Sequence, residues 1–183
     1  MDHATWTCDC GAVAAEIPVS GNRLVCYCSS CRGFVEDLNK PERLDAAGGN
    51  DLFQVDPRHV RLFKGTEHLR WMKRSPKGPM RWYAACCNTP MANTLSKRAL
   101  AFASFQVADI TPAEKLPDVG ARVHLKGALA RVEEPLGSVR PMIFSLLGRT
   151  VAGLVTGGYR RNPFFDSSGT PIAPRSDPDP SPG

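Results

Sequence analysis

The stretch CYCSSC, residues 26–31, places three thiols, Cys26, Cys28 and Cys31, in one short segment. Sulfurs this close in sequence can converge on one tetrahedral ion, because closing a short turn costs little chain entropy and zinc holds thiolates at about 2.3 Å. A structural zinc site normally has four protein ligands, whereas a reactive site keeps one position for water or substrate. The stretch therefore predicts a metal site with one open corner.

The composition is that of an ordinary folded protein. The chain has 183 residues, of which 42% are hydrophobic, so it can form one domain with a core and an appendage. Its seven cysteines are clustered, and the N-terminus lacks the basic and apolar regions of a secretion signal. Both features fit metal ligation better than disulfides. We therefore expect a cytoplasmic protein with reduced thiols.

A basic run lies between Arg58 and Arg81, where eight Lys or Arg residues accompany a single acid, Glu67. Such a run is typical of a solvated strand pair, or of a surface for an acidic partner or nucleic acid. The formal net charge of +5 is small for a nucleic-acid binder. We favour the solvated strand pair, and a binding module without turnover is the alternative function.

Short segments of alternating character predict a mainly β domain over residues 1–116. A hairpin is expected where residues 59–64 and 67–73 alternate on either side of Gly65 and Thr66. After the cysteine triple, Ser29 or Ser30 is a candidate cap for a short helix. Pro41 limits the length of that helix.

Residues 117–165 are expected to form an extension with one apolar helix within residues 139–159. Arg149 and four glycines interrupt this run, so we do not expect a membrane span. The helix is expected to pack on the β domain, as a lid over the reactive site, or on a second copy in a homodimer. Residues 166–183 hold five prolines and are expected to be a disordered tail.

The other cysteines form two pairs, Cys8 with Cys10 and Cys86 with Cys87. The motifs CDCGAV (8–13), CYCSSCRG (26–33) and CNTPM (87–91), in this order, resemble the glutathione-dependent formaldehyde-activating enzyme family. That family includes centromere protein V-like domains and has the Mss4-like β fold. The resemblance covers about residues 5–110, and three motifs in order are far more specific than any one alone.

The resemblance implies two zinc ions. The ligands of a structural site correspond to Cys8, Cys10 and Cys87, and the triple at 26, 28 and 31 corresponds to the ligands of the reactive zinc. The triple therefore takes the catalytic role. The resemblance also supplies the substrates, a small thiol such as glutathione and a small aldehyde. The thiol adds to the aldehyde, or is released from the adduct, as in a carbon–sulfur lyase.

The chain departs from the family pattern at position 84, where alanine replaces a structural ligand. Cys86 is the candidate replacement, and three arrangements remain open. In an extended chain, Cys86 and Cys87 point to opposite faces and Cys86 faces the reactive site. If the chain turns at Cys86, both reach the first zinc; in the third arrangement the first site is weak or empty. Asn88 replaces a glycine and tolerates the left-handed backbone of such a turn.

The chemistry of the triple favours a thiol as the fourth ligand. Zinc with three thiolates has a formal local charge of about −1, so it acidifies that ligand less than a histidine-bound zinc and suits an incoming thiol. Arg32, next to the triple, is a candidate for binding the thiol's carboxylates, with a surface role as the alternative. We assign no histidine as a ligand or base.

Overall fold

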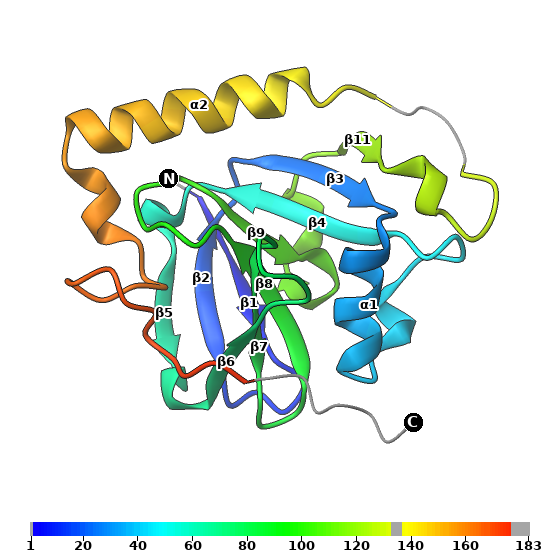
Figure 1. Ribbon diagram of the computed structural model, residues 1–183, viewed down its shortest axis with the longest axis horizontal. Helices are drawn as coiled ribbons and strands as arrows, with labels where there is room; N and C mark the ends of the chain where they lie inside the picture. Colours follow the sequence, from blue (N-terminus) through cyan, green and yellow to red (C-terminus); the bar gives the residue numbers. More distant parts are fainter. Residues whose placement is uncertain (1, 133–136, 177–183) are drawn as a thin grey trace.

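The computed structural model describes residues 2–132 and 137–176, which form two β-sheets and two α-helices (Figure 1). The smaller sheet has the order β10-β1-β2-β5, with β10 (Ile110–Thr111), β1 (His3–Thr7), β2 (Ala14–Pro18) and β5 (Arg61–Lys64). The larger sheet has the order β11-β3-β4-β9-β8-β7-β6. Its strands are β11 (Val119–Val123), β3 (Asn22–Cys26), β4 (Asn50–Val55), β9 (Ala103–Gln106), β8 (Thr89–Thr94), β7 (Met80–Ala84) and β6 (Leu69–Met72). The expected mainly β fold with a C-terminal helix is confirmed.

The C-terminal helix α2 (Arg140–Val155) crosses over one face of the larger sheet (Figure 1). Pro141 stands in its first turn, where a missing N–H costs nothing, and Gly157, left-handed at φ 68°, follows its end. Met142 is buried against Leu24 and Leu52 of the sheet. The helix thus packs on the β domain, as expected.

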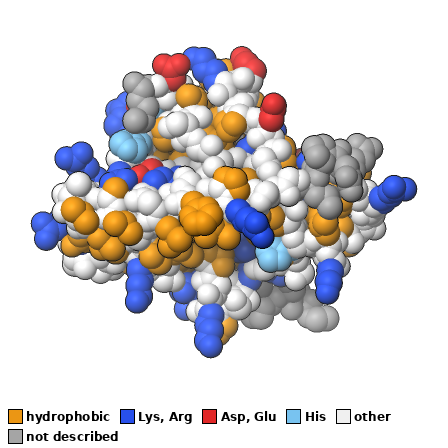
Figure 2. Space-filling view, turned by 90° about the horizontal axis from the view of Figure 1, so that it is seen from above, with side chains coloured by type: hydrophobic (Ala, Val, Ile, Leu, Met, Phe, Trp, Pro, Cys, Tyr) orange, Lys and Arg blue, Asp and Glu red, His pale blue; other side chains and the backbone are white. Residues whose placement is uncertain are grey.

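The outer face of α2 is exposed along its length. Phe144, Leu147, Val151 and Val155 all point to solvent, and Phe144 is 72% exposed. Figure 2 shows hydrophobic side chains in a band across this face of the molecule, with Lys and Arg side chains at its margins. Neither helix of the described chain is long and apolar enough to cross a membrane.

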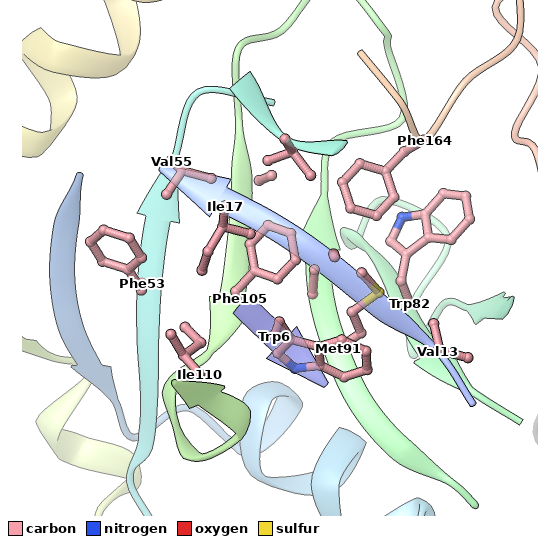
Figure 3. Packing of buried hydrophobic residues seen from close by; sticks show 14 of the residues in the cluster. Trp6, Val13, Ile17, Phe53, Val55, Trp82, Met91, Phe105, Ile110 and Phe164 are labelled. Atoms are coloured by element: carbon pink, nitrogen blue, oxygen red, sulfur yellow. The ribbon is translucent and has the colours of Figure 1, made fainter. Parts of the chain in front are cut away.

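The main hydrophobic core lies between the two sheets. Trp6 and Ile17 of the smaller sheet pack with Phe53, Trp82 and Phe105 of the larger sheet, and all five are fully buried (Figure 3). Side chains alternate along a strand, so the residues between these point to the opposite face of the larger sheet, under α2. One face of that sheet therefore forms the core, and the other is available for a site.

Segments beyond residue 116 belong to the same folded body. β11 pairs in parallel with β3, which places Val123 opposite Cys26. Phe164 is fully buried, and its ring centroid lies 5.0 Å from that of Trp82. The extension thus contributes both a strand and a core residue.

Part of the segment expected to be a tail is also packed. Trp71 Nε1 donates to the carbonyl of Ala173 at 3.0 Å, and the hydroxyls of Tyr83 and Ser176 lie 2.9 Å apart. Residues 173–176 therefore lie against β6 and β7, and Arg98 donates to the carbonyls of Asp166 and Ser167. Residues 177–183 of the expected tail lie outside the described residues.

The hairpin expected around Gly65 is wrong. β5 pairs with β2 in the smaller sheet, whereas β6 pairs with β7 in the larger one. Gly65 is left-handed at φ 70°, and a single 3-10 turn over residues 66–68 leads the chain from one sheet to the other. β6 buries Leu69 and Met72, whereas β5 is a largely exposed edge. The two strands differ in what they bury, and they therefore join different sheets.

Candidate metal centres

The three cysteines of residues 26–31 come together where β3 ends and α1 (Ser29–Asp37) begins. Their Sγ atoms all lie within 4.8 Å of one another, with 3.4 Å between Cys26 and Cys28. Sulfurs around a tetrahedral zinc stand about 3.8 Å apart, so the spacing fits such an ion. Cys26 and Cys31 are buried and Cys28 is partly exposed.

Cys28 is also the N-cap of α1. Its Sγ accepts the backbone N–H of Cys31 at 3.3 Å, so the expected cap by Ser29 or Ser30 is wrong. The Ser30 hydroxyl instead accepts a hydrogen bond from Arg81 at 2.8 Å. The start of a helix favours a negative charge, so the cap stabilises a thiolate at Cys28.

Hydrogen bonds within the triple give its cysteines different pKa values. The thiol of Cys26 donates to Cys28, which raises the pKa of Cys26 and lowers the pKa of Cys28. Metals bind thiolates, so every proton on the triple opposes metal binding. The triple thus already favours one of the anions that a metal requires.

Arg81 supplies a buried positive charge beside the triple. Its guanidinium nitrogens lie 3.8 and 3.9 Å from Cys31 Sγ, and the residue is 1% exposed. It also donates to Asn93 Oδ1 at 2.9 Å and packs over the ring of Phe34. This cation offsets the excess negative charge that three thiolates would leave on a divalent ion.

Sequence reasoning missed Arg81 because it counted the residue as part of the basic run. The signal was its setting in β7, where every residue is buried. An arginine inside such a strand needs a buried partner of opposite charge or several acceptors.

Arg32, the residue expected to bind the thiol, makes structural contacts. Its Nη1 donates to the carbonyl of Gly127 at 2.7 Å, and its Nε lies 3.7 Å from Glu36 Oε1. These contacts link α1 to the segment after β11. A role of Arg32 in ligand binding stays a prediction.

The second group joins the two cysteine pairs. The Sγ atoms of Cys8, Cys10, Cys86 and Cys87 all lie within 4.8 Å of one another. The separations include 3.3 Å between Cys10 and Cys86 and 3.6 Å between Cys8 and Cys10. Four sulfurs at this spacing form the closed set that structural zinc sites use.

A turn between β7 and β8 brings Cys86 into this group. Ala84 is fully buried at the end of β7, and its carbonyl accepts the N–H of Cys87 at 3.4 Å. Asn88 then adopts the left-handed conformation at φ 54°, as expected for this position. Between the extended and the turned chain, the structure has the turned one, and Cys86 lies with Cys87 rather than with the triple.

The surroundings of the four-cysteine group favour a thiolate at Cys87, whereas burial raises the pKa of Cys8 and of Cys86. Burial opposes ionisation of Cys87, but hydrogen bonds from Thr89 and Cys10 outweigh it and lower the pKa of Cys87 to about 7. The Thr89 hydroxyl lies 3.1 Å from Cys87 Sγ. Cys8 Sγ accepts the backbone N–H of Val13 at 3.2 Å.

An ion-pair network holds the loop between Cys8 and Cys10. Asp9, which separates these two ligands, pairs with Lys40 at 2.7 Å and with Arg43. Arg43 also pairs with the buried carboxylate of Asp109 at 2.8 Å. The loop is thereby tied to the body of the domain.

A cavity of about 360 Å³ lies between the triple and α2. Cys26, Cys31 and Arg81 line it on the side of the sheet, and α2 contributes Met142 and Leu146. The other lining residues are Leu24, Leu52, Gln54, Pro79, Asn93, Leu95, Phe102, Ser104, Val123, His124, Val139 and Ile143. The triple therefore borders a mainly apolar space that α2 covers.

A second hollow, of about 840 Å³, reaches the triple at Cys28. Its lining includes three basic residues, Arg122, Lys126 and Arg140, together with Ser29 at the start of α1. Val123, His124 and Val139 line both spaces. Two cysteines of the triple, Cys26 and Cys31, thus line the apolar cavity, and the third, Cys28, lines the basic hollow.

The basic run of residues 58–81 is divided among several local contacts. Arg58 pairs with Asp56, Arg61 with Glu16, and Arg74 with Asp37. Arg81 is buried at the triple. The run is therefore not one solvated strand pair: β5 is largely exposed, β7 is buried at every position, and the two belong to different sheets.

Comparisons with known proteins give a family but no activity. The model of a family of unknown function, DUF6151, matches residues 2–175. A crystal structure of a Rhodobacter sphaeroides protein is similar at 19% identity and a TM-score of 0.44, over 59% of this chain and 88% of that one. No curated protein matches the chain. Neither match names the formaldehyde-activating family that the motifs resemble.

Proposed function

The chain belongs to the DUF6151 family, whose function is unknown, and we propose that it is a zinc protein that binds a small thiol at its cysteine triple. The thiol adds there to a small aldehyde, or is released from the adduct, so the activity is that of a carbon–sulfur lyase. The difference between the two cysteine groups carries the proposal. One group has four sulfurs, and the other has three sulfurs beside a cavity.

Zinc is the metal that best fits both groups. Thiolate-only sets select zinc, copper(I) or iron–sulfur clusters, and the sulfur separations, all within 4.8 Å, are compatible with the tetrahedral coordination that zinc prefers. Cys8, Cys10, Cys86 and Cys87 would hold one ion, and Cys26, Cys28 and Cys31 the other. When bound at the triple, zinc supplies a site that keeps an incoming thiol deprotonated.

The addition needs no oxidant or reductant. The thiol sulfur forms a bond to the carbonyl carbon, the carbonyl π pair moves to oxygen, and the thiol proton ends on the new hydroxyl group. The reverse reaction returns thiol and aldehyde. Arg81 offsets the charge of the thiolates, and the basic hollow suits the carboxylates of a thiol such as glutathione. Arg32 supports this side of the site through its contact with Gly127.

The setting of such a protein is a reducing compartment, which we propose is the cytoplasm. Seven cysteines that serve as metal ligands must stay reduced to do so. The clustering of all seven into two groups supports this assignment.

We also propose that the outer face of α2 is the contact of a homodimer. Phe144, Leu147, Val151, Leu154 and Val155 form an exposed apolar row on this helix. A monomer rarely leaves so continuous an apolar surface in water. A second copy of the chain that presents the same row would cover the apolar surface of both copies.

Exchange spectroscopy by NMR tests the activity. Glutathione and formaldehyde form an S-hydroxymethyl adduct in solution, and magnetisation transfer measures how fast the adduct exchanges with free formaldehyde. The zinc-loaded chain should accelerate this exchange. Cys28→Ala should abolish the acceleration, and Ser20→Ala, at an exposed position that lines neither the cavity nor the basic hollow, should retain it. An exchange rate equal to that of the buffer would contradict the proposal.

A further inference from the structure

The cavity under α2 indicates what kind of aldehyde the site accepts. Resting on the thiol–aldehyde function above, we propose that the aldehyde carries an apolar chain or ring of medium size, as hexanal and benzaldehyde do. This apolar group lies in the cavity, and the charged part of the thiol lies in the basic hollow.

The position of the cavity relative to the sulfurs is the first argument. Cys26 and Cys31 line the apolar cavity, whereas Cys28 lines the basic hollow. A thiol bound between them has its sulfur at the junction of the two spaces. The carbon that bonds to that sulfur can direct its substituent into the cavity while the rest of the thiol occupies the hollow.

The lining of the cavity is the second argument. Leu24 and Leu52 are adjacent on β3 and β4, and Met142, Ile143 and Leu146 face them from α2. These five side chains offer an aldehyde substituent dispersion contacts and no hydrogen bonds. Leu95, Phe102, Val123 and Val139 extend the apolar lining, which also contains the polar side chains of Gln54, Asn93 and Ser104. A charged or hydroxylated substituent that lay against these apolar side chains would lose its water without compensation.

The size of the cavity is the third argument. A volume of about 360 Å³ lies in the range that holds organic ligands of moderate size. Formaldehyde has one carbon and one oxygen and would leave most of this space unfilled. Each CH₂ group that leaves water for an apolar wall raises affinity about fourfold, so a longer chain gains from the cavity.

The roof of the cavity is part of the family pattern. The matched family region, residues 2–175, includes the whole of α2, whereas the formaldehyde-activating resemblance ends near residue 110. The helix that covers the cavity therefore lies outside the region in which the chain resembles the formaldehyde-activating enzymes.

Calorimetry with two stable thioethers tests the inference without turnover. S-hexylglutathione carries five more CH₂ groups than S-methylglutathione and mimics the adduct of a six-carbon aldehyde. The zinc-loaded chain should bind the hexyl compound at least about tenfold more tightly. Equal affinities for the two compounds would overturn the inference.

Two neighbouring leucines of α2 provide matched variants. Leu146 lines the cavity, and Leu147 is 56% exposed on the outer face of the helix. Leu146→Trp should fill the cavity and remove the preference for the hexyl group, and Leu147→Trp should keep it. A preference that survives Leu146→Trp would place the hexyl group elsewhere and overturn the inference.

The exchange experiment separates this inference from the proposed function. Acceleration with glutathione and hexanal that exceeds the acceleration with formaldehyde supports both. Acceleration that is equal or greater with formaldehyde overturns the inference and leaves the function standing. Absence of acceleration with either aldehyde, together with absence of thioether binding, overturns both.

Discussion

Arg81 shows how one buried charge shapes the triple. Its guanidinium holds Ser30 and Asn93 by hydrogen bonds and lies beside Cys31 Sγ. A three-thiolate zinc with a bound thiolate carries two excess negative charges, and a buried cation lowers the free energy of that state. We therefore expect Arg81 to matter both for folding and for thiol affinity.

Replacement of Arg81 by methionine should destabilise the zinc-loaded chain by about 3 kcal/mol, because it leaves a buried thiolate without its cation. Arg32→Met, which removes an arginine whose described contacts are with Gly127 and Glu36, should cost about 1 kcal/mol. Urea denaturation of both variants measures the difference. Equal losses would show that Arg81 contributes packing and no specific charge compensation.

At the scale of elements, the sequence predicted what is local. The triple, the start of α1 and the end of β3 lie within a few residues, so their proximity follows from spacing alone. The position of Cys86 depends on the turn that β7 and β8 make after pairing, and on a loop 76 residues earlier that carries Cys10. From the sequence alone, the position of Cys86 beside Cys10 was one of three alternatives.

The two largest differences from expectation also come from long-range pairing. Gly65 gave a correct turn signal, but the partners of β5 and β6 were decided by which strand could bury its side chains. The cavity arises from residues on β3, β4, β7, β8 and β9 together with α2. No pattern within one segment indicates such a space.

Arg43 holds the loop of the four-cysteine group in place through its ion pairs with Asp9 and Asp109. Arg43→Ala should lower the free energy of unfolding by about 3 kcal/mol, because Asp109 would be left as a buried, unpaired carboxylate. The control is Arg61→Ala, whose pair with Glu16 is exposed and should cost less than about 1 kcal/mol. Denaturation curves that coincide for the two variants would contradict a structural role of this anchor.

The outer face of α2 makes a prediction about association. Introducing two negative charges by Leu147→Glu with Val151→Glu should weaken the dimer at least about a hundredfold, because both residues lie in the apolar row. Lys115→Glu changes the net charge by the same amount at an exposed position and should leave the dimer intact. Sedimentation velocity over a range of concentrations gives the dissociation constants. A wild-type chain that is monomeric throughout would refute the contact.

At the scale of the whole molecule, the two cysteine groups join segments that are distant in sequence. One group links the loop after β1 to the turn after β7, and the other lies where β3, β11 and α1 meet. Metal ions at these points would cross-link the sheets and α1 into one body. Metal binding should therefore contribute directly to folding.

Removal of metal should lower the melting temperature by about 10 °C or more, since a structural zinc contributes several kcal/mol and each kcal/mol shifts a domain of this size by a few degrees. Calorimetry with a chelator and a reductant present measures the shift. Readdition of zinc should restore the original transition. A melting temperature that is indifferent to the chelator would mean that the groups do not hold structural metal.

The most direct test of the account is the zinc content of the purified chain and of two variants, measured by elemental analysis. The account predicts two zinc ions in the wild type, and one in each of Cys28→Ala and Cys86→Ala, because each variant removes a ligand from a different group. A chain without zinc would contradict it. So would a single zinc that is lost in Cys28→Ala and kept in Cys86→Ala, because the four-cysteine group would then hold no metal.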